Sequence, residues 1–337
     1  MKLSVLIPTW NRPATVRRLL AQLDAQTLPP SDFEVIVVDD GSTPEAARAL
    51  ADLRLNISLR VLRQKNTGAA AARHAGALAA RGDLLVMLDD DMQVGPDFLE
   101  HHLAAHAGGG CLVVLGRIRA GSDQRETPLF ERWHAHLLDR KAEGILSGEL
   151  SLRGSLVFTG NVSMRREDYL AVGGFDVTLG QSEDIELGMR FEKRGVTFRF
   201  CEAAWSVHNG GQRSVEQWRE RARRYGACDL RIGRKHPELR DASPWRLVFD
   251  LHPLTRVAIR VALLWPAAGR LLAAMVIAVA RFLDDAGFER AAMASVSVGY
   301  SLEYFRGVRQ AAGWRAFEQL AQFRHRFAAR ERAALGM

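Results

Sequence analysis

The 337-residue sequence has little cysteine, and the little it has is scattered. Its three cysteines, Cys111, Cys201 and Cys228, are odd in number and far apart, which argues against a disulfide framework and against a cysteine-based metal cluster. A secretory leader is not expected, because the apolar run from Leu3 to Ile7 is short and ends at Pro8. Internal repeats and low-complexity tracts are also missing. We therefore expect a globular protein of a reducing compartment, the cytoplasm.

Charge is plentiful but unevenly distributed. The formal net charge is +7 and the sequence pI is near 9.7. Acidic residues cluster around 31–52, 83–100 and 183–192, whereas arginine dominates the last third. Such a basic region contacts an anionic partner, namely a lipid surface, a diphosphate or nucleic acid, or it is simply a solvated face. No nucleic-acid partner is expected, because the basic residues lack an identifiable reader motif.

The first half of the chain alternates short apolar runs with helical patterns. The apolar runs lack polar alternation, as in strands buried on both faces, and lie at Leu3–Ile7, Glu34–Val38, Leu59–Leu62 and Leu84–Leu88. Helix patterns lie at about 13–27, 44–52 and 68–81. Asn11 and Thr43, each shortly before a proline, are predicted to cap the first two helices. The alternation predicts an α/β fold with a mostly parallel central sheet flanked by helices.

Further elements follow before the character of the chain changes. Strands are expected at Leu112–Leu115, Ser155–Ser163 and Val196–Cys201, and Gly195 is expected to end a helix over Ser182–Arg194. We place the first domain at residues 1–211 and a helical C-terminal region at 212–337.

Two segments of this C-terminal region are candidates for membrane contact. The apolar stretch 257–283 contains a window, 261–280, that is long enough to span a bilayer, although Pro266 and Gly269 would kink it. The tail 314–335 places aromatic and leucine side chains three or four residues apart beside arginines. Such a helix lies in a membrane interface or docks on its own core, and the sequence leaves both open.

Two acidic clusters each follow a predicted strand. Asp39-Asp40 follows Glu34–Val38, and Asp89-Asp90-Asp91 follows Leu84–Leu88. Ligands of open parallel sheets bind outside the carboxyl ends of the strands, so both clusters are expected to face one crevice. Three successive carboxylates repel each other, and a divalent cation bound through oxygen ligands would offset that cost.

These segments, taken in order, resemble the family 2 glycosyltransferases, which have the GT-A fold. The resemblance covers about residues 1–211 and is carried by Val5–Arg12, Val37–Ser42, Asn66–Gly68 with Arg73, Leu88–Asp91, Thr159–Asn161, Gly173–Asp176 and Glu183–Leu187. Each segment is weak evidence alone, but the ordered set is strong. The resemblance implies a nucleotide-sugar-binding domain followed by a helical extension.

The family implies roles for individual residues. The residues expected along the nucleotide-sugar are Pro8, Thr9, Asn11, Arg12, Asp39, Asn66, Gly68, Arg73, Asp89 and Asp90. Asp39 would bind the base, which points to a UDP- or dTDP-sugar. Arg73 suits a phosphate or a carboxylate, although it could instead be a surface charge. Glu183, Gly160 and Asn161 are expected on the acceptor side.

Asp184 is the expected catalytic base. It would take the proton of the acceptor hydroxyl in a single inverting displacement. It is predicted to open a helix after Ser182, whose positive end would keep its carboxylate ionised. Acids in a first helical turn are also ordinary capping chemistry, and only the family order favours catalysis.

The family also implies a divalent metal, Mn²⁺ or Mg²⁺, that would clamp the leaving diphosphate. Asp91 and Asp89 match its Asp-x-Asp motif, and Asp91 is the better candidate for direct contact. His208, after a predicted strand, is a candidate third ligand.

We therefore expect an inverting, metal-dependent glycosyltransferase with a nucleotide-sugar donor and a hydroxyl acceptor. The acceptor proposed is a lipid-linked saccharide of cell-surface polysaccharide synthesis, with the enzyme peripheral on the inner face of the plasma membrane. No Gln-x-x-Arg-Trp motif is present, so single transfer is favoured over polymerisation. The alternatives are a non-catalytic nucleotide-binding module of the same fold and a nucleotidyltransferase.

Overall fold

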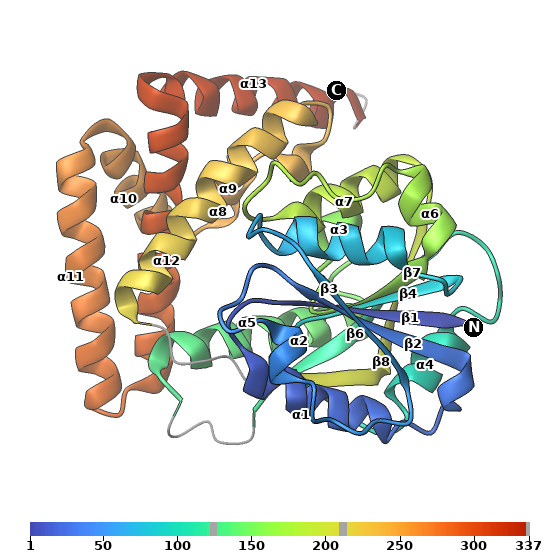
Figure 1. Ribbon diagram of the computed structural model, residues 1–337. Coiled ribbons are helices and arrows are strands. Elements are labelled where there is room, and N and C mark those ends of the chain that lie inside the picture. Colours follow the sequence, from blue (N-terminus) through green and yellow to red (C-terminus); the bar gives the residue numbers. More distant parts are fainter. Residues whose placement is uncertain (122–126, 209–213, 335–337) are drawn as a thin grey trace. The chain divides into compact units, whose positions relative to one another are not determined.

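The computed structural model describes residues 1–121, 127–208 and 214–334 of the chain, with side chains as far as residue 327 (Figure 1). The chain forms two compact units. The first comprises Met1–Glu126 and His134–Gly211, and the second comprises Thr127–Trp133 and Gln212–Met337. The boundary expected after residue 211 falls in 209–213, outside the described residues.

The first unit is built on an eight-stranded sheet with the order β3-β2-β1-β4-β7-β6-β8-β5. The strands are β1 (Leu3–Thr9), β2 (Phe33–Asp39), β3 (Ser58–Arg63), β4 (Leu84–Leu88), β5 (Met92–Val94), β6 (Leu112–Ala120), β7 (Asn161–Arg165) and β8 (Thr197–His208). The β1–β2, β1–β4, β2–β3 and β6–β8 pairs are parallel, whereas β7 and β5 pair antiparallel to their neighbours. The predicted mostly parallel α/β sheet is confirmed.

Helices cover both faces of this sheet (Figure 1). The helices of the first unit are α1 (Pro13–Asp24), α2 (Ala46–Ala49), α3 (Ala69–Ala79), α4 (Phe98–Ala105), α5 (Leu129–Leu146), which begins in the other unit, α6 (Arg166–Ala171) and α7 (Glu183–Lys193). Val5 and Ile7 of β1 pack in the apolar cluster that α1 and α4 complete, and Leu6 packs in the cluster of α3, α6 and α7. Successive side chains of a strand point to opposite faces, so an unbroken apolar run fills both clusters.

The region predicted as a strand at Ser155–Ser163 is only partly one. Its start is a short 3-10 turn, η2 (Gly154–Leu156), and β7 begins at Asn161. The adjoining prediction was better: α7 ends at Lys193, and Gly195 has the left-handed φ of +71° that a terminating glycine supplies.

The predicted caps of the first two helices are wrong. Arg12, not Asn11, precedes α1, and Asn11 has a left-handed φ of 55° with its side-chain oxygen accepting from the Thr43 amide at 2.8 Å. Helix α2 begins at Ala46, beyond Thr43, and its first amide donates to Oδ2 of Asp39 at 2.9 Å. The first amide of α2 is thus capped by Asp39, at the end of β2, rather than by the residue just before the helix.

The second unit is helical. Its helices are α8 (Val215–Lys235), α9 (Arg246–Asp250), α10 (Pro253–Leu264), α11 (Pro266–Asp285), α12 (Glu289–Ala312) and α13 (Ala316–Ala334). Leu320 and Phe323 of α13 are 6% and 7% exposed and belong to the apolar core of this unit. Of the two interpretations of the tail, docking on its own core therefore describes these side chains.

The apolar stretch 257–283 is not one helix. It is broken at Trp265, and Pro266 begins α11. Gly269, near the start of α11, lets that helix approach α10, since a Cβ there would lie 2.8 Å from Cβ of Ala262. By length and composition, α11 alone among the described helices could cross a membrane, and 22% of that apolar window is buried.

Candidate active site

The carboxyl ends of β1, β2 and β4 are adjacent in the sheet, and their polar residues meet there. Thr9 ends β1, Asp39 ends β2, and Asp89 to Asp91 follow β4. The two acidic clusters therefore lie at one edge of the sheet, as expected from strand order.

A chain of polar contacts joins β1 to the acidic triplet. Thr9 Oγ1 donates to Oδ2 of Asp90 at 2.7 Å, and both residues are buried. Arg12 Nη1 lies 3.1 Å from Oδ1 of Asp90 and 2.9 Å from Oδ2 of Asp91. His208 completes the chain, with Nε2 3.6 Å from Oδ2 of Asp91. A single guanidinium thus offsets two buried carboxylates that would otherwise repel each other.

The two carboxylates of this chain differ in acidity. Burial, reinforced by the charges of Asp91 and Asp89, raises the pKa of Asp90 to about 6 against the lowering effects of Thr9 and Arg12. Burial also acts on Asp91, but His208 and Arg12 outweigh it and lower the pKa of Asp91. Of these two carboxylates, Asp91 therefore stays anionic more readily.

Asp39 and Asp40 organise the neighbouring loops. Asp39 Oδ1 accepts from the Ser42 amide at 2.7 Å, and Oδ2 accepts from the first amide of α2. Asp40 Oδ1 accepts from the Thr67 amide at 2.9 Å, and Oδ2 accepts from the Gly68 amide at 2.8 Å. Both carboxylates are buried, so their backbone contacts hold the loops at the edge of the sheet.

The remaining residues expected at the nucleotide lie on the same loops. Pro8 is buried within β1, whereas Asn11 and Asn66 are exposed. The Asn11 amide donates to Ser42 Oγ at 2.9 Å, which ties the segment after β1 to the loop after β2. Gly68 has a left-handed φ of +97° just before α3, a conformation that glycine adopts without strain.

Arg73 on α3 is buried rather than a surface charge. Its Nη1 donates to Oε1 of Glu183 at 3.1 Å, and its Nη2 pairs with Oδ1 of Asp89. The side chain is 6% exposed. Arg73 therefore joins the carboxylates expected on the donor side and on the acceptor side.

Asp184 lies next to that pair, in the first turn of α7. Its Oδ1 accepts from the Ile185 amide at 2.8 Å, the helix-end contact expected from the sequence. The hydrogen bond from Ile185 lowers the pKa of Asp184, but burial and the charge of Glu183 outweigh it. Together they raise the pKa of Asp184 from its ordinary value of 3.8 to about 7. The residue is half-buried. A carboxylate with this pKa is suited to accept a proton near neutral pH.

The two other residues expected on the acceptor side differ in position. Gly160 faces the acidic edge, because a Cβ there would lie 3.2 Å from Oδ2 of Asp89. Asn161 is fully buried, and its amide donates to the Ala204 carbonyl at 2.8 Å while its Oδ1 lies 2.9 Å from Nε2 of His102. The structure thus brings Gly160 to the site and places Asn161 in the interior.

The donor atoms beside Asp91 fit a divalent cation in part. Oδ1 of Asp91 is buried and has no hydrogen-bond partner, which leaves an acceptor available next to His208. Oδ1 of Asp89 is engaged by Arg73. Among the described residues, no three His, Cys, Asp or Glu side chains form a metal-binding group. Mg²⁺ sites commonly take one or two protein carboxylates together with substrate phosphates, so this partial set is compatible with a metal that arrives with a nucleotide.

Sequence reasoning placed Asp40 at the site but did not predict its contacts. Its hydrogen bonds to the Thr67 and Gly68 amides depend on the position of the next loop. His134 of α5 lies with its ring centroid 6.2 Å from that of His208, and its local sequence carries no motif that would have signalled this.

Comparison with known proteins agrees with this geometry. The sequence model of glycosyl transferase family 2 matches residues 4–170. Validoxylamine A glucosyltransferase of Streptomyces hygroscopicus subsp. limoneus is 31% identical over 270 residues, which cover 72% of this chain and 58% of that protein. Undecaprenyl-phosphate 4-deoxy-4-formamido-L-arabinose transferase of Pseudomonas aeruginosa strain LESB58 is 34% identical over 140 residues, 40% of each chain.

The structural comparison concerns the fold alone. The crystal structure of S. aureus TarS 1-349 covers 92% of this chain and 91% of its own, with a TM-score of 0.51 and 17% sequence identity. The chain spans about three fifths of the length of the first curated relatives, 58% and 63%. The GT-A type of fold implied by the sequence resemblance is confirmed. Through its first unit, the chain belongs to glycosyl transferase family 2.

Proposed function

We propose that the chain is a metal-dependent, inverting glycosyltransferase that transfers a sugar from a UDP- or dTDP-sugar to a hydroxyl acceptor. One observation carries the proposal: Asp91, with an unpartnered buried oxygen beside His208, shares an edge of the sheet with Asp89, which Arg73 links to Glu183 next to Asp184. Arg73 thus links the acidic triplet that would face the metal to the turn of α7 that carries the proposed base.

In this proposal Asp184 removes the proton of the acceptor hydroxyl as that oxygen attacks the anomeric carbon. The new glycosidic bond forms on the face opposite the departing phosphate, so the sugar–phosphate bond breaks with inversion. The proton stays on Asp184, whose pKa near 7 suits both its uptake and its release. Asp91 and His208 would hold Mn²⁺ or Mg²⁺, which when bound stabilises the negative charge of the leaving diphosphate.

The other residues of the edge bind and orient the donor. Arg12 is 44% exposed at its side chain and can reach a phosphate while staying near Asp90 and Asp91. Pro8, Thr9, Asp39, Asn66 and Gly68 line the loops along which the nucleotide would lie. Gly160 leaves room beside Asp89 for the sugar, because any side chain there would approach that carboxylate.

We further propose a lipid-linked saccharide as the acceptor and a peripheral location on the inner face of the plasma membrane. Support comes from the second unit. Leu271 and Phe282 of α11 are 63% and 71% exposed, and Trp265 before it is 61% exposed. Between 253 and 283 the sequence contains arginines but no Asp or Glu. An apolar helix face with cationic neighbours and no acids is the pattern that binds anionic bilayers.

Isothermal titration tests the donor site. UDP, dTDP, GDP and CDP are titrated into the full chain with and without Mn²⁺, using wild type, Asp91→Asn and the control Asp52→Asn, whose side chain is 70% exposed. We expect UDP or dTDP to bind only with Mn²⁺, the Asp91 variant to lose at least about tenfold in affinity, and the control to match wild type.

Release of UDP or dTDP from the corresponding nucleotide-sugar then separates the enzyme from a binding module. A chain that binds the nucleotide with metal but never turns over any donor would be a non-catalytic module. A chain that binds no nucleotide under any condition would overturn the proposal.

A further inference from the structure

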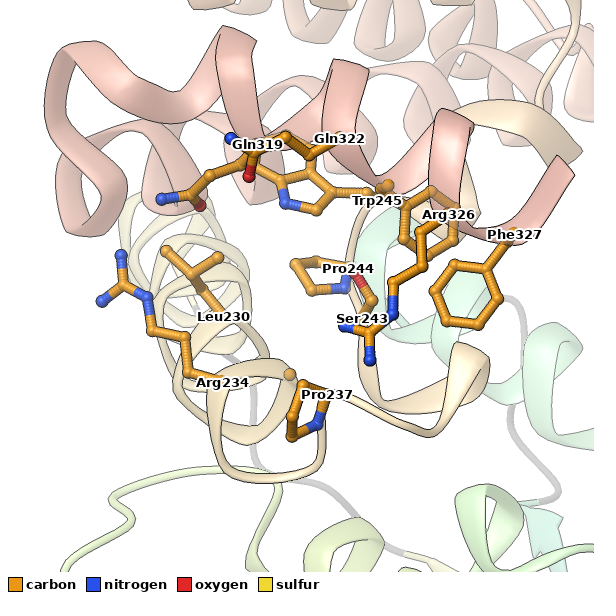
Figure 2. Close-up of a pocket in the computed structure, with 12 residues that line it drawn as sticks. Leu230, Arg234, Pro237, Ser243, Pro244, Trp245, Gln319, Gln322, Arg326 and Phe327 are labelled. Carbon is orange, nitrogen blue, oxygen red and sulfur yellow. The ribbon is translucent and has the colours of Figure 1, made fainter. Parts of the chain in front are cut away.

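The second unit contains a cavity of about 560 Å³ that the first unit does not contribute to. Its lining comes from α8, from the segment that joins α8 to α9, and from α13 (Figure 2). Ligand pockets in proteins commonly enclose about 300–1,000 Å³. The cavity is therefore large enough for a small ligand and belongs to a single compact unit.

Half of the residues that line the cavity are apolar, and two of them stack on aromatic rings outside the lining. Trp245 and Phe323 are 4% and 7% exposed, and they form the most deeply buried aromatic part of the wall. Trp245 stacks on Phe305 with ring centroids 6.1 Å apart, and Phe323 stacks on Phe249 at 5.9 Å. These contacts come from behind the wall, so the apolar surface is fixed before any ligand arrives.

The polar part of the lining is cationic. Arg234 lies beside Leu230 on α8, and Arg326 lies beside Phe327 on α13 (Figure 2). Both arginines are exposed, and the Arg326 guanidinium lies 5.9 Å from the centroid of the Phe327 ring. None of the described residues that line the cavity is an aspartate or a glutamate. The wall therefore offers an anion a guanidinium group from each of two helices and no repelling carboxylate.

We propose that this cavity binds an amphiphilic phosphate, a phosphate ester of an apolar chain. The chain packs against Trp245 and Phe323, and the phosphate pairs with Arg234 and Arg326. Gln319 and Gln322 on the same stretch of α13 offer amide donors to the remaining phosphate oxygens. The site is independent of the acidic edge of the first unit, and nothing in the proposed transfer reaction requires it.

The probe is decyl phosphate below its micellar concentration, titrated calorimetrically into the full chain without nucleotide, sugar or metal. Decyl glucoside tests whether the apolar chain suffices, and inorganic phosphate tests whether the anion suffices. The variants are Arg234→Gln and Arg326→Gln. Their matched controls are Arg231→Gln on α8 and Arg324→Gln on α13, which are exposed and lie outside the lining.

We expect saturable one-to-one binding of decyl phosphate and a loss of about tenfold for each lining variant, because charge-assisted contacts to phosphate are lost. The two controls are expected to stay within about twofold, since screening weakens distant charges. Thermal unfolding of all four variants should match wild type, because the exchanged side chains are exposed.

Three results would overturn the proposal. Equal binding by lining and control variants would place the ligand elsewhere. Binding of decyl glucoside as tight as that of decyl phosphate would show that the apolar chain alone accounts for binding. Binding of inorganic phosphate as tight as that of the ester would make free phosphate the ligand. The assay contains no donor, so none of these results bears on transferase activity.

Discussion

Nη1 of Arg73 lies 3.1 Å from Oε1 of Glu183, which is 110 residues further along the chain. The other arm of the same guanidinium pairs with Asp89, directly after β4. Helix α3 therefore holds the end of a central strand and the beginning of α7 in one position. Asp184, the carboxylate proposed as the base, is the next residue after Glu183, so the same contact helps to position it.

Replacing Arg73 should cost far more stability than replacing an exposed arginine. Arg73→Met leaves two carboxylates without their counter-ion, and breaking a buried ion pair in this way costs about 3–5 kcal/mol. Arg17 is the matched control, since it forms a two-pronged pair with Asp52 at 2.5 and 2.7 Å whose carboxylate is 70% exposed. Arg17→Met should cost much less, because its ion pair with Asp52 is exposed to solvent. Urea unfolding of both variants measures the difference, and equal losses would contradict it.

Much of the site could be predicted from sequence because it depends on strand ends. Unbroken apolar runs identified β1, β2 and β4, and the rule that parallel strands end at one edge brought the two acidic clusters together. Thr9 was expected there only from the family resemblance. The identity of partners was not predictable. Arg73 could equally have been a surface charge, since its partners Asp89 and Glu183 are distant in sequence and are brought to it only by the fold.

The errors have physical causes of the same kind. Asn11 and Thr43 are good capping residues locally, but Asp39 provides the contact to Ala46 from a neighbouring strand. The stripe predicted for the tail is only partly buried, since Trp314 and Phe317 are 69% and 40% exposed. Amphipathicity states only that one face is buried, not by what. Whether lipid or protein buries Leu320 and Phe323 depends on the core of the second unit.

The proposed base should give activity a characteristic pH dependence. Asp184 must be ionised to accept a proton, so turnover should rise as pH passes through about 7 and level off above it. Asp184→Asn should lower kcat by about 10²–10⁴-fold while the nucleotide still binds with metal. A rate profile of donor turnover from pH 5 to 9 and titration calorimetry of the variant measure both effects. Retained turnover in the variant would exclude Asp184 as the base.

Stability should respond in the opposite direction to activity. The folded state raises the pKa of Asp184 above its ordinary 3.8, so the native protein holds this proton more tightly than the unfolded chain. The free energy of unfolding contributed by Asp184 is therefore lost as pH rises from about 4 to about 7. Asp184→Asn cannot ionise, so at pH 8 it should be at least as stable as wild type. A variant markedly less stable at pH 8 would show that the carboxylate serves the fold.

The position of α7 should depend on two facing glycines. A Cβ on Gly188 would lie 2.1 Å from the carbonyl oxygen of Gly154 in η2, a distance that no side chain tolerates. Gly188→Ala should therefore force α7 away from η2 and cost at least about 2 kcal/mol, as overpacking does. Gly180→Ala is the control, because no described atom lies within 4 Å of the Cβ it would add. Chemical unfolding measures stability, and nucleotide turnover shows whether Asp184 has moved.

The exposed face of α11 should bind anionic membranes. Leu271, Met275, Val279 and Phe282 recur three or four residues apart and are 49–71% exposed, whereas Ala273, Ile277 and Ala280 on the other face are buried. Leu271→Glu and Phe282→Glu place acids where the segment has only arginines, so each should weaken binding to vesicles containing phosphatidylglycerol by at least about tenfold.

Leu78→Glu is the control, an exposed leucine on α3 in the first unit. Vesicle sedimentation at low and high salt measures the effect, and part of the binding should be lost at high salt because the arginines are screened. If the α11 variants sediment with vesicles as wild type does, the apolar face is not the membrane contact and the peripheral location loses its structural support.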